Sequence, residues 1–188
     1  MRIIGGAFKG VKLYEAFDKN TRPLKDLVKE SILNILNYSN NEKTNLENSA
    51  VLDLFSGTGS FGLECVSRGA KKVYFCENYI KSLEILEKNV KKLKCQKKVK
   101  IFNKSAHALF ENKELKNEAF DLIFLDPPFK EGLINSILKH IVKLNILKKN
   151  GIIVLHRHKK TKEDFCKEFV ISRSEKYGIS KIIFGKIN

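Results

Sequence analysis

Four consecutive residues could bind and activate an amino group: Asp126, Pro127, Pro128 and Phe129 follow the apolar run 122–125 and include two of the chain's three prolines. Neither proline has an N–H, so the segment offers a carboxylate and carbonyl oxygens as acceptors. A nucleobase could stack on Phe129 while Asp126 and the Pro127 carbonyl hold its NH2. Two prolines after a strand can also be a simple stop signal. We expect the catalytic site at these four residues.

A glycine-containing loop is the second candidate site. Gly57, Gly59 and Gly62 have Gly-x-Gly-x-x-Gly spacing between the apolar run 50–54 and a predicted helix, where the backbone can approach a ligand closely. By itself this spacing is also a dinucleotide fingerprint. Glu77, about 20 residues further on, ends the next predicted strand, where a carboxylate can accept both hydroxyls of a ribose. These features fit NAD or any other adenosine-bearing cofactor.

Asp53 discriminates between these cofactors. Its carboxylate lies at the mouth of the loop, where it would repel a pyrophosphate but attract the ammonium and sulfonium groups of S-adenosylmethionine. We therefore expect S-adenosylmethionine, S-adenosylhomocysteine as its product, and no metal. The candidate cofactor contacts at these motifs are Asp53, Phe55, Ser56, Gly57, Thr58, Gly59, Glu77, Asn78 and Asp126.

Alternating strands and helices must position these motifs. Apolar runs at 50–54, 72–76, 99–102, 120–125 and 151–155 alternate with amphipathic helices that begin near residue 61 and cover 80–93 and 134–141. This pattern predicts a parallel sheet covered on both faces. The runs 169–172 and 180–184, with a turn at Gly178, predict a terminal hairpin at the sheet edge. We expect an α/β, doubly wound, mostly parallel seven-stranded sheet that binds ligands at the carboxyl ends of its strands.

A basic arm precedes this sheet in the sequence. Residues 2–13 contain glycines between short apolar pieces, which is typical of a small hairpin. Apolar residues at helical spacing follow from Pro23 to Leu36. We divide the chain into an N-terminal β-hairpin arm, residues 1–20, and a catalytic domain, residues 21–188.

The charge balance indicates a polyanionic partner. The chain has 36 Lys and Arg against 21 Asp and Glu, a net charge of +15, although a lysine-rich coding bias alone could give this excess. We expect RNA contacts at Arg2, Lys9, Lys12 and Arg22. No apolar stretch approaches the roughly 18 residues of a membrane span, and no secretory signal precedes the arm, so we expect a cytoplasmic protein.

The cysteines and histidines show no metal-binding spacing. The four cysteines lack Cys-x-x-Cys pairs, and isolated thiols are more often small core residues than ligands, so we expect reduced thiols. The four histidines form no metal set with a Cys or Asp, and we expect structural or surface roles for them. These residues are Cys65, Cys76, Cys95, Cys166, His107, His140, His156 and His158.

Taken together, the glycine loop with Asp53, the strand-end Glu77 and the Asp-Pro-Pro-Phe segment resemble the amino-group methyltransferases that use S-adenosylmethionine. The chain as a whole is similar to the bacterial small-subunit ribosomal RNA (guanine-N2)-methyltransferase family. The resemblance implies methyl transfer to the 2-amino group of a guanine, in ribosomal RNA of an assembled or assembling small subunit, by a monomer with no membrane partner. The matching blocks are residues 2–13, 21–23, 28–30, 33–36, 52–59, 67–70, 120–129 and 176–178.

Two positions depart from the pattern of that family. Ser105 and Ala106 stand where an acidic residue often precedes the alanine, and the resemblance places them at the cofactor adenine. The fifth sheet strand ends in His156-Arg-His158, where an acidic residue is common.

Three other functions fit parts of the pattern. A DNA adenine or protein glutamine methyltransferase shares Asp-Pro-Pro-Phe, although the chain has little room for a separate DNA-reading domain. A nicotinamide dehydrogenase would use the glycine loop and Glu77 but conflicts with Asp53. A non-catalytic RNA-binding or ribosome assembly protein would need only the basic surface.

Overall fold

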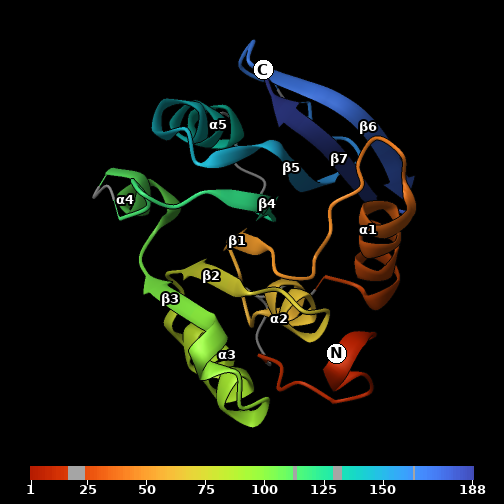
Figure 1. Cartoon of the computed structure of the whole chain (residues 1–188), viewed down its shortest axis with the longest axis vertical. Helices are drawn as coiled ribbons and strands as arrows, with labels where there is room; N and C mark the ends of the chain where they lie inside the picture. Colours follow the sequence, from red (N-terminus) through yellow and green to blue (C-terminus); the bar gives the residue numbers. More distant parts are fainter. Residues whose placement is uncertain (17–23, 112–113, 129–132, 163) are drawn as a thin grey trace.

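A seven-stranded mixed sheet runs through the centre of the computed structural model, which describes residues 1–16, 24–111, 114–128, 133–162 and 164–188 (Figure 1). The strand order is β3-β2-β1-β4-β5-β7-β6, with the first five strands parallel and β7 antiparallel to both β5 and β6. The predicted α/β sheet and its terminal hairpin are confirmed. The strands are β1 (Ala50–Leu54), β2 (Lys72–Glu77), β3 (Val99–Asn103), β4 (Phe120–Leu125), β5 (Leu147–His158), β6 (Phe169–Tyr177) and β7 (Ser180–Ile187).

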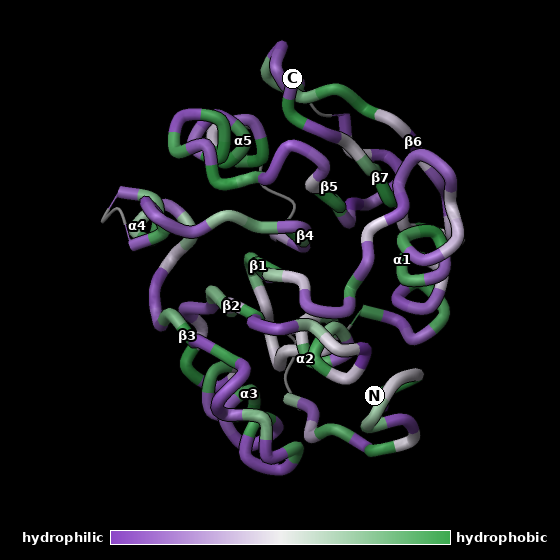
Figure 2. The backbone as a smooth tube through the Cα atoms, viewed as in Figure 1, coloured by the Kyte–Doolittle hydropathy of each residue, from purple (hydrophilic) through white to green (hydrophobic). Residues whose placement is uncertain are grey.

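Helices cover both faces of the sheet, because successive strand residues point to opposite faces and both sets are apolar. Val51 and Val73 belong to the hydrophobic cluster shared with α1, α2 and α3, whereas Leu52 and Tyr74 belong to the cluster shared with α4 and α5. In Figure 2, α3 and α5 alternate between hydrophobic and hydrophilic colour, as expected of helices with one buried face. The helices are α1 (Asp26–Tyr38), α2 (Ser60–Ser67), α3 (Ile80–Lys92), α4 (Ala106–Glu111) and α5 (Leu133–Leu144).

The structure adds two features that the hydrophobic pattern did not predict. Helix α4 is only six residues long, too short for helical periodicity to appear in the sequence. Strand β5 begins at Leu147, before the expected residue 151. Residues 148–150 are polar and exposed, so no apolar run marks this part of the strand in the sequence. Of the helices that the structure describes, none combines the length and apolar character that a membrane span requires.

The N-terminal segment, residues 1–16, packs against the sheet domain and folds back on itself without regular hairpin strands. It contains one isolated antiparallel bridge, Arg2 to Lys12, and the 3-10 turn η1 (Gly6–Phe8). Ile3 and Leu13 are buried in the cluster shared with α1, α2 and α3. A Cβ at Gly6 would lie 1.9 Å from the Ser67 carbonyl oxygen. The segment reverses direction as expected, since the Ile3 N–H donates to the Val11 carbonyl at 3.0 Å and the Leu13 N–H to the Met1 carbonyl at 3.1 Å, but the regular strands of a hairpin are not shown.

A candidate active-site cleft at the carboxyl ends of the strands

A cleft of about 530 Å³ lies at the carboxyl ends of β1, β2 and β4. Parallel pairing of β1 with both neighbours brings the residues after these strands to one edge. Its walls come from the β1–α2 loop, residues 77–79, residues 126–128 and His156. Met1, Ala16 and Leu24 complete the lining, so the N-terminal segment forms part of the cleft.

The β1–α2 loop is hydrogen-bonded to the end of β2. Ser56 Oγ donates to the carbonyl of Asp53 at 2.6 Å and accepts the Cys76 N–H at 3.0 Å. Gly57, at φ +54°, donates its N–H to Glu77 Oε2 at 2.7 Å. Gly62 is the second required glycine, since a Cβ there would lie 2.3 Å from the Phe75 ring. Glycine is therefore required at residue 57 by its positive φ, with open space around it, and at residue 62 by the close packing of α2 on the sheet.

Glu77 receives further bonds at its other oxygen. Oε1 accepts the N–H groups of Asn78 at 2.9 Å and Tyr79 at 2.7 Å. These bonds orient the carboxylate beside the glycine loop, at the position predicted for ribose recognition.

Asp53 is almost completely buried beneath the loop, with a 1% exposed side chain whose Oδ2 accepts the Gly62 N–H at 2.9 Å. Burial raises the pKa of this carboxyl to about 8, the Gly62 bond opposes the rise, and the nearby carboxylates of Asp126 and Glu77 add to it. Three carboxyl groups therefore face one cleft, an arrangement that favours a positively charged ligand.

Asp126 follows β4 and is hydrogen-bonded to the end of β5. Its Oδ1 lies 2.8 Å from His156 Nδ1, and its side chain is 25% exposed. The carbonyls of Pro127 and Pro128 both accept from Arg157 Nη1 at 3.2 Å. The Asp-Pro-Pro bend thus faces the cleft with its acceptors held by two consecutive residues of β5.

His156 and Arg157 are site residues that the sequence reasoning did not identify. His156 was expected to be structural or on the surface, yet it lines the cleft and contacts Asp126. Parallel pairing of β4 with β5 would have located His156. Leu125 lies opposite Leu155 in that pair, so Asp126 and His156, the residues that follow them, are neighbours.

The structure brings most of the predicted cofactor residues together. Gly59 shapes the loop at φ +85°, while Ser105 caps α4 by accepting the Ala108 N–H at 3.2 Å, and Ala106 begins that helix. These three residues are not among those that line the cleft in the described part of the chain. The predicted residues that do line it are Asp53, Phe55, Ser56, Gly57, Thr58, Glu77, Asn78, Asp126, Pro127 and Pro128.

The predicted RNA-binding residues in the described segment 1–16 are not among those that line the cleft. Arg2, Lys9 and Lys12 are exposed on the N-terminal segment, with Arg2 and Lys12 opposite each other in the isolated bridge. Phe129 and Arg22 fall outside the described residues.

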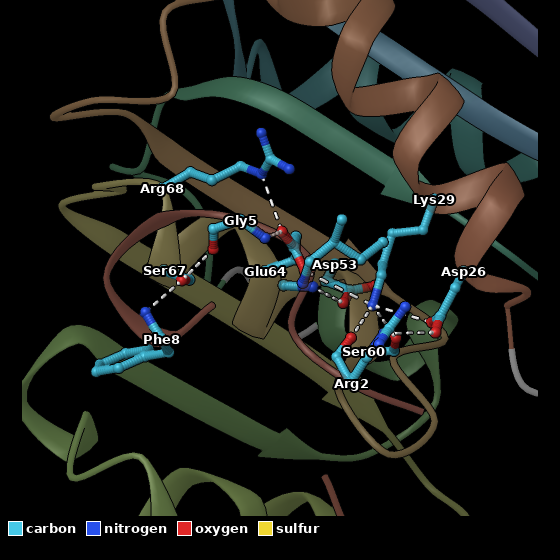
Figure 3. Close-up of polar contacts among 12 residues, drawn as sticks. Arg2, Gly5, Phe8, Asp26, Lys29, Asp53, Ser60, Glu64, Ser67 and Arg68 are labelled. Atoms are coloured by element: carbon cyan, nitrogen blue, oxygen red, sulfur yellow. Dashed lines mark hydrogen bonds and ion pairs between the residues drawn. The ribbon is translucent and has the colours of Figure 1, made fainter. Parts of the chain in front are cut away.

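Polar side chains of α1 and α2 hold the N-terminal segment in place (Figure 3). Glu64 accepts the N–H groups of Ile4 at 2.7 Å and Gly5 at 2.8 Å, while Lys29 Nζ donates to the Arg2 carbonyl at 2.8 Å. Burial lowers the pKa of Lys29, and the carboxylates of Glu64 and Asp26 oppose that shift. None of these contacts was predicted from the sequence.

Asn89 connects the same segment with the glycine loop. Its Oδ1 accepts the Tyr14 N–H at 2.7 Å, and its Nδ2 donates to the carbonyls of Tyr14 and Thr58, each at 3.1 Å. Because Thr58 lines the cleft, this fully buried amide couples the N-terminal segment to the candidate cofactor loop.

Comparison with known proteins gives relatives over the whole chain. Residues 1–186 match the family described as "Conserved hypothetical protein 95". The chain is 30% identical over 187 residues to "Putative rRNA methyltransferase YlbH" of Bacillus subtilis, covering 99% of this chain and 98% of that protein. It is 35% identical over 162 residues to "Ribosomal RNA small subunit methyltransferase D" of Haemophilus influenzae, covering 85% and 79%.

Solved structures share the fold. The chain superposes on "Putative methyltransferase yhhF from Escherichia coli" with a TM-score of 0.83 at 24% identity, covering 100% of this chain and 98% of that one. It superposes on the crystal structure of "putative methylase HI0767 from Haemophilus influenzae" with a TM-score of 0.77 at 30% identity and the same coverage. These likenesses extend from the N-terminal segment through the terminal hairpin.

Proposed function

This chain belongs to the family described as "Conserved hypothetical protein 95", and on that basis we propose that it is an S-adenosylmethionine-dependent methyltransferase acting on the 2-amino group of a guanine in small-subunit ribosomal RNA. Relatives named as ribosomal RNA small subunit methyltransferases support this proposal. The observation that carries it is the position of Asp126, beside a cleft whose other walls bear Asp53 and Glu77.

The chemistry of the cleft fits the proposed cofactor. S-adenosylmethionine has two positively charged groups and a ribose diol, and supplies a methyl group made electrophilic by its sulfonium. Asp53 and the β1–α2 loop would hold the methionine end, and the Glu77 carboxylate would accept the ribose hydroxyls. A cleft of about 530 Å³ is within the usual range for small-molecule sites. The three carboxyl groups around one cleft support a cationic ligand over a pyrophosphate.

Asp126 and the Pro127 carbonyl would activate the guanine amino group. An exocyclic amine is a weak nucleophile because its lone pair is delocalised into the ring. Hydrogen bonds from its two protons to Asp126 and Pro127 favour a pyramidal nitrogen with a localised pair. The Pro127 oxygen already accepts from Arg157 and keeps a second lone pair for the amine.

The transfer also requires removal of a proton. As the nitrogen forms its bond to the methyl carbon, the bond from that carbon to sulfur would break and S-adenosylhomocysteine would leave. The nitrogen, then positively charged, would lose a proton to the Asp126 carboxylate. Phe129 is proposed to stack on the flipped base. Most of the acceleration would come from positioning and electrostatics.

Labelled methyl transfer onto unmodified small ribosomal subunits, followed by nucleoside mass analysis, tests the proposal. We expect label in N2-methylguanosine. Asp126→Ala should bind the cofactor normally but lose turnover by about 10²-fold or more. Free ribosomal RNA, DNA and protein fractions tested in parallel identify the substrate class. Label on adenine or protein, or a near-normal rate for Asp126→Ala, would contradict the proposal.

A further inference from the structure

His156 is held at both ring nitrogens. Nδ1 lies 2.8 Å from Asp126 Oδ1, and Nε2 lies 2.9 Å from the hydroxyl of Ser180, the first residue of β7. His156 is 5% exposed and Ser180 is 4% exposed, so their contact is shielded from water, whereas the Asp126 side chain is 25% exposed toward the cleft. The three side chains form a continuous chain across the ends of β4, β5 and β7.

The chemistry of these partners determines the direction of each bond. An ionised carboxylate only accepts, so the neutral ring must place its hydrogen on Nδ1 and donate it to Asp126. Nε2 is then an acceptor, and the Ser180 hydroxyl, which can both donate and accept, donates to it. Asp126 thereby selects the tautomer, and Ser180 satisfies the nitrogen that is left as an acceptor.

We propose that His156 is a positioning residue that holds Oδ1 of Asp126, so that Oδ2 is presented to the incoming amine. The inference rests on the proposed function and adds to it a residue that does not touch the reacting atoms. An aspartate side chain has two rotatable torsions, and the single bond to His156 restricts both. A displacement of about 1 Å at a reacting group can cost about 10²-fold in rate, so this restraint acts on turnover more than on binding.

Three variants separate the hydrogen bond from the bulk of the ring. His156→Phe keeps an aromatic ring but has no donor, and we expect turnover about 10²-fold below wild type. His156→Asn places an amide donor near the position of Nδ1, and it should recover at least about tenfold of that loss. Ser180→Ala leaves the ring but removes the hydroxyl that donates to Nε2, and we expect a smaller loss of turnover. His140→Phe, outside the cleft, is the matched control and should keep the wild-type rate.

Binding measurements and spectroscopy exclude a general folding defect. KM for ribosomal subunits and the cofactor Kd should change by no more than about threefold in His156→Phe, since only the orientation of Asp126 is lost. Long-range proton–nitrogen correlation spectra of the His156 ring should show a hydrogen on Nδ1 in the wild type. That tautomer preference should weaken in Asp126→Ala.

The outcomes distinguish this inference from the proposed function. If the wild-type protein methylates a guanine amino group and His156→Phe does so at the same rate, only the positioning role is overturned. A wild-type His156 ring whose hydrogen resides on Nε2 has the same consequence. A rate in His156→Asn no higher than in His156→Phe also overturns it, because the hydrogen bond then contributes nothing. Wild-type protein that methylates no guanine amino group overturns the proposed function itself.

Discussion

Lys29 Nζ and Glu64 Oε2 lie 3.7 Å apart, and both side chains are fully buried. The pair joins α1 to α2, and both residues form hydrogen bonds with the backbone of the N-terminal segment. Because residues of this segment and Ser60, a further partner of Lys29, line the cleft, the ion pair supports the candidate site as well as the fold.

Removing one member of this pair should destabilise the protein strongly. Lys29→Met leaves Glu64 as a buried charge with less compensation, and we expect a loss of about 3–5 kcal/mol in the free energy of unfolding. The double variant with Glu64→Gln should lose less than the sum of the two single changes. Denaturant unfolding measures these values. Lys25→Met, an exposed neighbour, is the control and should stay within about 0.5 kcal/mol of wild type; a Lys29→Met protein equally close would contradict the role of the pair.

Asp53 should make stability depend on pH. Its folded pKa is about 8 against an ordinary value of 3.8, so the folded protein keeps a proton that the unfolded chain has released. The contribution of Asp53 to the free energy of unfolding therefore falls as pH rises from about 4 to about 8. Asp53→Asn keeps an acceptor for the Gly62 N–H but does not titrate.

Without cofactor, the thermal midpoint of Asp53→Asn should rise relative to wild type between pH 5 and pH 8.5. Asp164→Asn removes the same formal charge at an exposed position and provides the control. A constant difference between wild type and Asp53→Asn across this range would show that burial does not retain the proton. We also expect Asp53→Asn to bind S-adenosylmethionine more weakly, because the amide, unlike the carboxyl group, cannot ionise beside the cationic cofactor.

Glu77 should determine cofactor affinity. Glu77→Gln retains one carbonyl acceptor but replaces the other oxygen with a donor, which would oppose the Gly57 N–H and one ribose hydroxyl. We expect the Kd for S-adenosylmethionine to rise by about tenfold, as a loss of about 1.4 kcal/mol implies, with little change in RNA binding. Isothermal titration measures the Kd, and Glu84→Gln on the exposed face of α3 is the matched control. An unchanged Kd in Glu77→Gln would contradict ribose recognition by Glu77. Thermal stabilisation of the wild type by NAD equal to that by S-adenosylmethionine would contradict the proposed cofactor.

RNA contact by the N-terminal segment is best tested through side chains. Deleting the segment would remove Ile3 and Leu13 from the core and Met1 and Ala16 from the cleft, so cofactor binding would be lost with it. Replacing Arg2, Lys9 and Lys12 by Gln leaves this packing intact. If each residue contacts a phosphate, the plot of log K for RNA binding against log salt concentration should become less steep, by about 2 to 3 units of slope.

A triple change at Lys139, Lys143 and Lys149 removes the same charge elsewhere, on α5 and at the start of β5, and serves as the control. Equal effects of the two triple variants on RNA binding would indicate a general charge effect and no contact surface on the N-terminal segment. Cofactor affinity should be unchanged in both.

The sheet and the cofactor motif could be predicted from the sequence because their signals are local. Apolar runs such as 120–125 bury both faces of a strand and therefore show no alternation. Gly57, Gly59 and Glu77 follow consecutive strands at a spacing that itself implies a common edge. The position of Asp126 on the same edge follows from the parallel order alone.

Only the tertiary structure determined which distant residues complete this site. Asp126 and His156 are 30 positions apart, and Ile4 and Glu64 are 60 positions apart. Their contacts depend on strand register and on how one segment packs over a helix, and neither leaves a periodic pattern in the chain. The N-terminal residues gave a hairpin signal from glycine and charge, but burial of Ile3 and Leu13 and the bonds to Glu64 favoured a packed segment. Local propensity defined the elements, whereas long-range burial and hydrogen bonding defined their partners.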